Sequence, residues 1–420
     1  MKFYLIIEQF YFLVLLLCAL CFLVLLFYAK RGTKSKLLLS EYPQKTKFAI
    51  LIPARNESGV IESNLCSLLA SEYPEQLYDV YVIVESMDDP TVDIVRKYDR
   101  AEIFLRKDIE GRRMKGYALD ECIKSILASG KEYDAFLILD ADNLVDKSFL
   151  SAMSNAYRQG FDAACGKRDN KDWNSSVVSS SSALTFTVIN TLQNKPKTDR
   201  GMNVMFSGTG FYVSYEVIRK LGGWPFASLT EDYEFSNYAV VNDLKTCYVE
   251  SAVYYDEQPD SLGQSIKQRT RWVRGFFQVK KEYKREKRNY SKCKPDSADM
   301  RAMKYGTTPL LVLAIDVVLY LLTTLLAFLI AVIDRSGNSS LYGKRILLTV
   351  LLVYAAIALF TVFLFRIERG SINISKKNKF KTVLYHPFFL ATYVVSAVRA
   401  LYVKDKWEVI THKGGSDGNV

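Results

Sequence analysis

The sequence has few of the features that mark the commonest nucleotide-binding and secreted proteins. Neither the Gly-rich dinucleotide fingerprint nor the phosphate loop is present, which argues against a dehydrogenase or a P-loop NTPase. The seven cysteines, an odd number, lack the spacing of a disulfide framework or a zinc site, and Cys18 and Cys21 fall inside an apolar run. We therefore interpret the cysteines as small apolar fillers in a reducing environment.

Positive charge is not scarce, but no nucleic-acid recognition motif accompanies it. The formal net charge is +11, and the basic run from Lys280 to Lys294 comes just before an apolar segment. Anionic lipid is the simpler partner for such a run, and a solvated charged face is the alternative. We expect no nucleic-acid partner.

The apolar residues gather at the two ends of the chain. Phe10 to Ala29 is uncharged and long enough to cross hydrocarbon, which takes roughly 20 helical residues. Lys30 and Arg31 follow it, unlike the small residues that end a signal peptide. We predict a membrane helix within residues 1–30, with the amino terminus outside and the following domain in the cytoplasm.

Three more apolar stretches follow the middle of the chain. Residues 306–333 and 346–365 are predicted to span the membrane. Residues 382–403 have the length of a span but contain His386 and Pro387 and have lysines on both flanks, so they suit an interfacial or re-entrant helix as well as a transmembrane one. In the interfacial case the tail, 404–420, stays in the cytoplasm.

Between these stretches, residues 45–260 alternate short β-branched runs with segments of helical period, which predicts an α/β domain with a mainly parallel sheet. The expected strands are 48–52, 80–85, 102–105 and 135–140, and the expected helices lie near 58–70, 90–98, 115–129 and 147–159. Ligands of such sheets bind beyond the carboxyl ends of the strands.

Polar residues stand at these strand ends. Pro53 to Glu57 follow the first strand, Glu85 to Asp89 the second, and Asp140-Ala141-Asp142 the fourth. Asp140 and Asp142 project to the same side and offer hard oxygen ligands for a divalent cation that bridges a diphosphate. Acidic pairs also cap and solvate turns, so the position of this pair after a buried-looking strand is what favours a metal.

Two further motifs lie downstream. Thr230-Glu231-Asp232 precedes a helix-like stretch, where helix capping is the alternative interpretation. Gln268-Arg269-Thr270-Arg271-Trp272 lies in a predicted interfacial helix and basic linker, residues 261–300, where membrane anchoring is the alternative.

Together these motifs, in this order and between membrane segments, resemble the processive family 2 glycosyltransferases that make cellulose, chitin, hyaluronan, poly-N-acetylglucosamine and related glucans. The resemblance implies a GT-A (Rossmann-like) domain inserted between transmembrane helices, and an Mg²⁺ or Mn²⁺ cofactor. It implies that Asp140 contacts the nucleotide and, with Asp142, the metal. Asp232 would be the general base, within the Thr230-Glu231-Asp232 motif.

The resemblance also assigns the remaining site residues. The family usually has Asp where this chain has Glu85, so Asp88 is kept as the second candidate for that contact. Acceptor contacts would come from Gly208, Gln268 and Trp272, and a gating segment from Trp407, Thr411 and Lys413. The nucleotide-sugar contacts would come from Pro53, Arg55, Glu57, Glu85, Asp88, Lys115, Asp140 and Arg271.

By that resemblance the chain is an inverting enzyme that polymerises a UDP-sugar into a β-linked polysaccharide and couples synthesis to export through the plasma or inner membrane. Its partners would be the donor, the growing polysaccharide and membrane lipid. UDP-glucose is the first expectation for the donor. A polymer containing N-acetylglucosamine, or transfer of one sugar to a membrane lipid, are the alternatives, and a transporter or scaffold with a degenerate soluble domain is the non-enzymatic one.

Overall fold

The computed structural model describes residues 43, 45–107, 110, 112–294, 297–299, 301, 308–335 and 338–403, and residues 9–11, 13, 16, 17, 20 and 23. The helix expected within residues 1–30 falls largely outside the described residues. The expected gating residues lie outside them as well: Trp407, Thr411 and Lys413.

Four parallel strands form the first half of the sheet, in the order β3-β2-β1-β4. Ile50 of the central strand pairs with Val80 on one side and with Leu137 on the other. The strands lie within one or two residues of the predicted ranges: β1 (Phe48–Pro53), β2 (Tyr78–Val84), β3 (Ala101–Leu105) and β4 (Ala135–Ile138). Short apolar runs made all four strands readable in the sequence, and β1, β2 and β4 are largely buried.

The second half of the sheet is mixed, which corrects the expectation of a mainly parallel sheet. β7 is antiparallel to both β4 and β6, β6 and β8 are parallel, and β5 is antiparallel to β8. β7 follows a loop in which Gly208 and Gly210 have positive φ. These strands are β5 (Leu144–Val145), β6 (Ala163–Asn170), β7 (Phe211–Ser214) and β8 (Thr246–Asp256).

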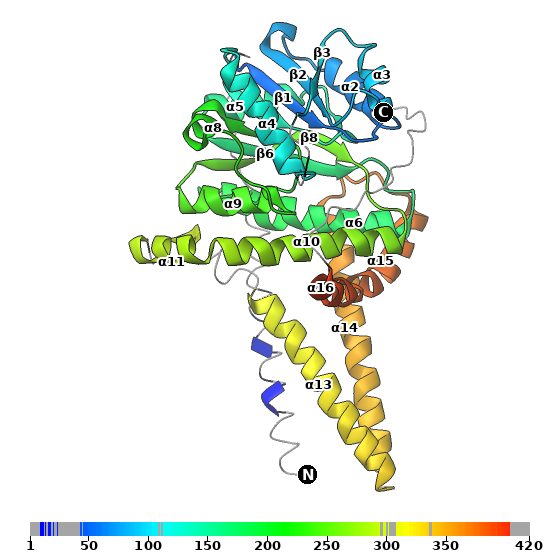
Figure 1. The fold of residues 1–420 in the computed structure, drawn as a ribbon. Coiled ribbons are helices and arrows are strands. Elements are labelled where there is room, and N and C mark those ends of the chain that lie inside the picture. The colour runs from blue at the N-terminus through cyan, green and yellow to red at the C-terminus, as the bar shows by residue number, and fades with distance from the viewer. Residues whose placement is uncertain are drawn as a thin grey trace.

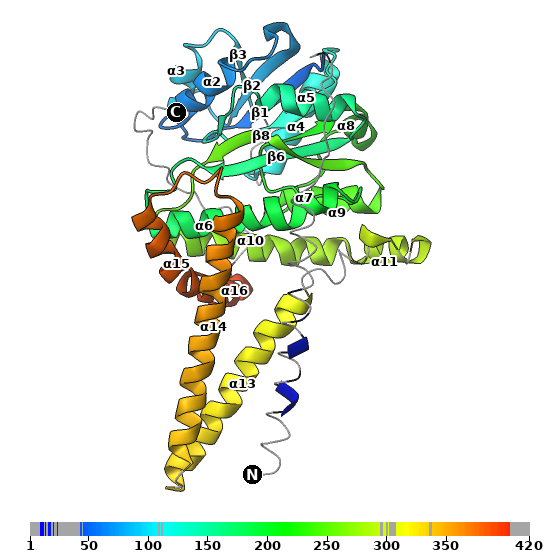
Figure 2. The same cartoon turned by 180° about the vertical axis from the view of Figure 1, so that it is seen from behind.

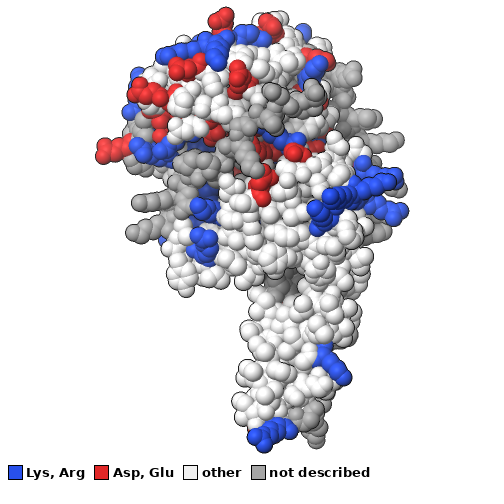
Figure 3. All heavy atoms as spheres, turned by 90° about the vertical axis from the view of Figure 1, so that its right-hand side faces the viewer, with Lys and Arg blue, Asp and Glu red and all other residues white. Residues whose placement is uncertain are grey.

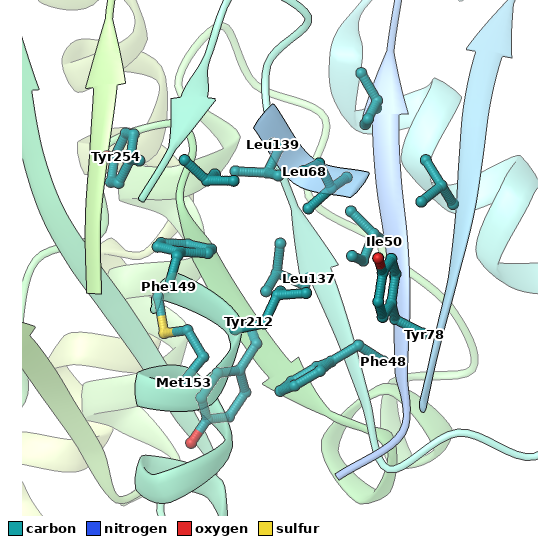
Figure 4. Close-up of a cluster of buried hydrophobic side chains, with 14 of the residues drawn as sticks. Phe48, Ile50, Leu68, Tyr78, Leu137, Leu139, Phe149, Met153, Tyr212 and Tyr254 are labelled. Carbon is teal, nitrogen blue, oxygen red and sulfur yellow. The ribbon is translucent and has the colours of Figure 1, made fainter. Parts of the chain in front are cut away.

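Helices cover both faces of the sheet because alternate strand residues point to opposite faces. Ile50 belongs to one buried cluster, part of which Figure 4 shows, and Leu51 belongs to the other. The first face is covered by α2 (Ile61–Leu69), α3 (Pro90–Val95) and α5 (Phe149–Arg158). The second is covered by α4 (Lys115–Ala128), α8 (Tyr215–Leu221) and α9 (Glu231–Val241).

A layer of helices lies between the sheet domain and the long apolar helices (Figures 1 and 2). The longest of them, α10, runs across the underside of the domain, and α11 continues it beyond the domain edge. This layer consists of α6 (Val177–Thr187), a π-helical segment (Val188–Asn194), α7 (Lys195–Thr198), α10 (Leu262–Glu282) and α11 (Lys284–Cys293). The helix expected within 261–300 is thus present as α10 and α11.

Two long helices, α13 (Thr308–Ile333) and α14 (Ser339–Ile367), form a stalk below this layer. Its surface carries few charged side chains along most of its length (Figure 3). Among the described residues, three stretches are long and apolar enough to cross a membrane: 315–333, 339–367 and 376–402.

The third of these stretches is broken into α15 (Lys376–Ala391) and α16 (Tyr393–Tyr402), which lie beside α10 and across the stalk (Figures 1 and 2). Arg269 of α10, 1% exposed, holds the break. Its guanidinium donates to the Phe389 carbonyl oxygen (3.3 Å) and to Thr392 Oγ1 (2.8 Å), and it lies 4.4 Å from the ring centre of Tyr393.

Candidate functional site

One cavity of about 2190 Å³ extends from the carboxyl ends of the strands down to α13, α14 and α15. All of the described residues predicted for the site line it except Asp88, which is exposed and bonded to Ser86 instead. The predicted residues in its wall are Pro53, Arg55, Glu57, Glu85, Lys115, Asp140, Asp142, Gly208, Thr230, Glu231, Asp232, Gln268, Arg271 and Trp272. Acidic side chains gather in a hollow where the domain meets the helical layer (Figure 3).

The loop after β1 is held by the start of α3. Asp89 is the N-cap of that helix and accepts from the Thr91 backbone N–H (2.9 Å). Its other carboxylate oxygen accepts from the backbone N–H of Asn56 (2.8 Å), which has the unusual φ of 57°. Thr91 Oγ1 accepts from the Glu57 backbone N–H (2.9 Å). These bonds fix the backbone that carries Arg55 and Glu57 in the wall of the cavity.

Glu85, at the end of β2, is held between two arginines. Arg55 and Arg106 each approach its carboxylate to 3.3 Å, and Arg106 also pairs with Glu121 at 3.3 Å. Arg106 is 4% exposed, so it is a fixed part of the wall. The sequence interpretation missed Arg106, although it directly follows the predicted third strand.

The Asp140-Ala141-Asp142 turn is built by Asn143 and Thr209. The backbone N–H of Asp140 donates to Thr209 Oγ1 (2.8 Å) and Asn143 Oδ1 (3.1 Å). Asn143 Nδ2 donates to Asp142 Oδ1 (3.2 Å). Lys115 forms an ion pair with Asp140 and donates to the Gly208 carbonyl oxygen at 2.6 Å.

The residues at this turn fit a hard divalent cation. Both carboxylates line the cavity, and Mg²⁺ is commonly held by one or two carboxylates with substrate phosphates and water supplying the rest. Within the described part of the chain no group of three or more acidic, histidine or cysteine side chains could hold a metal ion. The two aspartates therefore suit a metal shared with a diphosphate rather than an all-protein site.

Glu231 and Asp232 lie in the first turn of α9, where the helix dipole favours carboxylates. Burial nevertheless raises the pKa of Glu231 to about 7, despite Lys115 at 3.8 Å, and burial also raises the pKa of Asp232. Thr230 occupies the N-cap position, but its hydroxyl makes no capping bond. Capping alone therefore does not explain this motif.

α10 approaches that turn so closely that only glycine fits at position 275. A Cβ atom there would lie 2.4 Å from Thr230 Oγ1. One turn earlier, Arg271 reaches the cavity, and its buried Nε has no hydrogen-bond partner among the described residues. Burial lowers the pKa of Arg271, a cost that a bound anion would offset.

Gln268 and Trp272 face the cavity from the same helix. The indole of Trp272 meets the ring of Phe186 edge to face, with centroids 5.8 Å apart at 83°. The Arg168 guanidinium lies 3.7 Å from the centre of the Phe186 ring. Arg168 and its partner Asp256 also line the cavity, and the sequence interpretation missed both because β6 and β8 were not predicted.

The comparisons with known proteins agree with this geometry. The family model described as "Glycosyltransferase like family 2" matches residues 43–275, more than half of the chain. The chain belongs to this family. The resemblance noted in the sequence is thereby confirmed, and the protein is a family 2 glycosyltransferase.

Two curated relatives show the range of the similarity. The chain is 26% identical over 257 residues to poly-beta-1,6-N-acetyl-D-glucosamine synthase of Staphylococcus epidermidis, covering 60% of each chain. It is 26% identical over 240 residues to the probable glycosyltransferase YdaM of Bacillus subtilis, covering 54% of this chain and 55% of that one. The matches thus span less than two thirds of these relatives.

A solved structure shares the fold over nearly the whole length. The mannosyltransferase PcManGT from Pyrobaculum calidifontis, in complex with GDP-Man and Mn²⁺, has a TM-score of 0.58 and 16% sequence identity. The match covers 95% of this chain and 97% of that one. It supports the GT-A-like α/β fold followed by candidate membrane helices.

Proposed function

We propose that this glycosyltransferase is an integral membrane protein that polymerises N-acetylglucosamine from UDP-N-acetylglucosamine into a β-linked polysaccharide. The observation that carries the proposal is the shared cavity. Its wall brings together Asp142, Asp232 and Trp272 from three motifs that lie far apart in the sequence.

The donor sugar is taken from the relatives and not from any one side chain. The similarity to poly-beta-1,6-N-acetyl-D-glucosamine synthases favours N-acetylglucosamine over the glucose that was the first expectation. No contact in the cavity identifies glucose.

The reaction is one displacement at the anomeric carbon. Asp232 accepts the proton of the acceptor hydroxyl as that oxygen attacks, and the bond from the anomeric carbon to the diphosphate breaks with its electron pair leaving on UDP. An α-linked donor thus yields a β-linkage. The raised pKa of Asp232 makes it a stronger base than an exposed aspartate.

Negative charge develops on the leaving diphosphate, on the side of the anomeric carbon away from the acceptor, and positive charge there stabilises it. Arg271 and Lys115 supply this positive charge from α10 and the start of α4. Asp142, with Asp140, would hold Mg²⁺ or Mn²⁺, which as a Lewis acid stabilises negative charge on the diphosphate. Glu85 would contact the nucleotide, and Gly208, Gln268 and Trp272 the acceptor, with the indole against the apolar face of a sugar ring.

The membrane arrangement follows from the same cavity. It continues past Trp272 to Asp316 of α13 and to α14, which offers the polymer a way towards the bilayer. We propose that α15 and α16 lie in the membrane interface, because Arg269 ties their junction to α10. The catalytic domain and the tail would then face the cytoplasm.

Transfer of a single sugar to a membrane lipid is the second candidate. The apolar wall that α13 and α14 give to the cavity favours it, because a lipid acceptor could enter there.

Membranes containing the protein, incubated with a panel of labelled UDP-sugars and Mg²⁺ or Mn²⁺, test the proposal. We expect incorporation from UDP-N-acetylglucosamine into a product that a β-N-acetylglucosaminidase degrades. A labelled product that extracts into organic solvent would favour the lipid acceptor, and incorporation only from UDP-glucose would refute the sugar assignment.

A further inference from the structure

Asp256, at the end of β8, is linked to the proposed metal side of the cavity. It is 2% exposed, and its Oδ1 accepts from Asn143 Nδ2 at 2.9 Å. The same amide nitrogen donates to Asp142 Oδ1 at 3.2 Å. One buried side chain, Asn143, thus spaces the two carboxylates.

Asp256 is also linked to the proposed acceptor side, through Arg168. Nε and Nη2 of Arg168 donate to Asp256 Oδ2 at 3.1 and 2.5 Å, and Nη1 donates to the Ser207 carbonyl oxygen at 2.7 Å. The guanidinium face lies on the ring of Phe186, and that ring meets Trp272. Contacts therefore run without a gap from Asp142 to Trp272.

The choice of arginine fits this double task. A guanidinium can pair with a carboxylate in its plane and stack on a ring with its face, which an ammonium group cannot do. Burial by itself lowers the pKa of Arg168, but the attraction of Asp256 outweighs it and raises that pKa, so the guanidinium stays charged. A buried ion pair adds little net stability compared with apolar residues, so its presence calls for another role.

We propose that Arg168 and Asp256 are positioning residues that fix the place of Trp272 relative to Asp142, so that the acceptor is held in line with the donor. This rests on the proposed function, because it takes Trp272 as the contact for the acceptor sugar. Neither residue is expected to touch the reacting atoms.

The test compares Arg168→Met and Arg168→Lys with a matched control, Lys167→Met. Lys167 is the neighbouring residue of β6 and is similarly buried, in an ion pair with Glu368 at 3.0 Å, but it does not line the cavity. KM is measured separately for donor and for a short β-linked N-acetylglucosamine oligosaccharide. Calorimetry gives the Kd of the oligosaccharide without turnover.

We expect Arg168→Met to raise the acceptor KM and Kd roughly 10- to 100-fold, the scale of a misplaced binding group, and to leave the donor KM unchanged. Arg168→Lys should fall between Met and wild type, because it keeps the charge without the planar stack. Arg168→Met should add nothing further in a Trp272→Ala background, since both changes remove the same contact.

Three results would overturn the proposal. Arg168→Met could raise the donor KM as much as the acceptor KM, or Lys167→Met could raise the acceptor KM as much as Arg168→Met does. The third is that the effects of Arg168→Met and Trp272→Ala on the acceptor KM add up in the double variant. If Arg168→Met fails to fold because Asp256 is left as an unpaired buried charge, the double variant Arg168→Met/Asp256→Asn removes both charges and takes its place. If the wild type does not use UDP-N-acetylglucosamine, the same assays are run with the donor and acceptor that it does use. That failure would count against the proposed function and not against the positioning role.

Discussion

Lys115 and Asp140 form an ion pair in the wall of the cavity, and Lys115 also donates to the Gly208 carbonyl oxygen. Burial lowers the pKa of Lys115, but Asp140 and Glu231 more than compensate, so the pKa is raised and the ammonium group is retained. A bound diphosphate would therefore meet a positive charge that the protein has already placed.

Replacing Lys115 with Met should weaken UDP binding. The loss of one charged hydrogen bond costs about 1.5–3 kcal/mol, which is roughly a 10- to 100-fold rise in Kd. Titration calorimetry with UDP and Mn²⁺ measures it, and Lys124→Met, an exposed lysine of the same helix, is the control. An unchanged Kd for Lys115→Met would remove Lys115 from the nucleotide site.

Asp232→Asn and Asp142→Asn should fail in different ways. The first removes the proposed base, so kcat should fall by about 10²- to 10⁴-fold with UDP binding retained. The second removes an anionic ligand, so the metal-dependent part of UDP binding should weaken. Substantial polymer from Asp232→Asn would exclude the base role, and equal UDP binding by Asp142→Asn with and without EDTA would exclude the metal role.

The packing of α10 against the Thr230 turn gives a prediction about backbone proximity. Gly275→Ala places a Cβ 2.4 Å from Thr230 Oγ1, and overpacking of this kind costs about 1–3 kcal/mol and would displace the motif. Gly263→Ala lies in the same helix with open space around it and serves as the control. The midpoint temperature of thermal unfolding and the specific activity should both fall for Gly275→Ala and stay unchanged for Gly263→Ala. Equal behaviour of the two variants would contradict the close approach.

Glu231 predicts a pH dependence of stability. Its pKa rises from 4.5 to about 7 on folding because the carboxyl is buried. Between these values the folded state binds more protons than the unfolded state, so the free energy of unfolding falls as pH rises through that range. Thermal scans from pH 4.5 to 7 should show this loss in the wild type and less of it in Glu231→Gln. Parallel profiles would mean that Glu231 ionises normally.

The sequence was sufficient to predict those parts of the fold in which a local apolar pattern coincides with burial. The strands β1, β2 and β4 consist largely of buried apolar residues, and the polar residues that follow them could be placed beyond the sheet by topology alone. The Asp140 turn and the Trp272 helix carry motifs from which the sequence predicted one common site, and both line the same cavity.

The features that the sequence did not predict depend on contacts between segments that are distant in the sequence. β7 runs antiparallel to β4 and β6, and no local sequence pattern encodes that direction. Arg168 and Asp256 lie near the ends of β6 and β8. The mixed composition of these strands did not predict them, so the residues at their ends were not recognised as part of the site. At the break between α15 and α16, Thr392 accepts a hydrogen bond from Arg269, which is more than 100 residues away in the sequence.

The size of the product shows whether the enzyme polymerises. Purified protein in lipid nanodiscs is supplied with UDP-N-acetylglucosamine, Mn²⁺ and a labelled N-acetylglucosamine oligosaccharide in large excess, and the products are separated by length early in the reaction. We expect long β-linked chains beside unused primer, because the acceptor stays in the cavity between additions. We expect no chains from Asp232→Asn. Products no longer than one added sugar, or label transferred only to lipid, would contradict polymerisation.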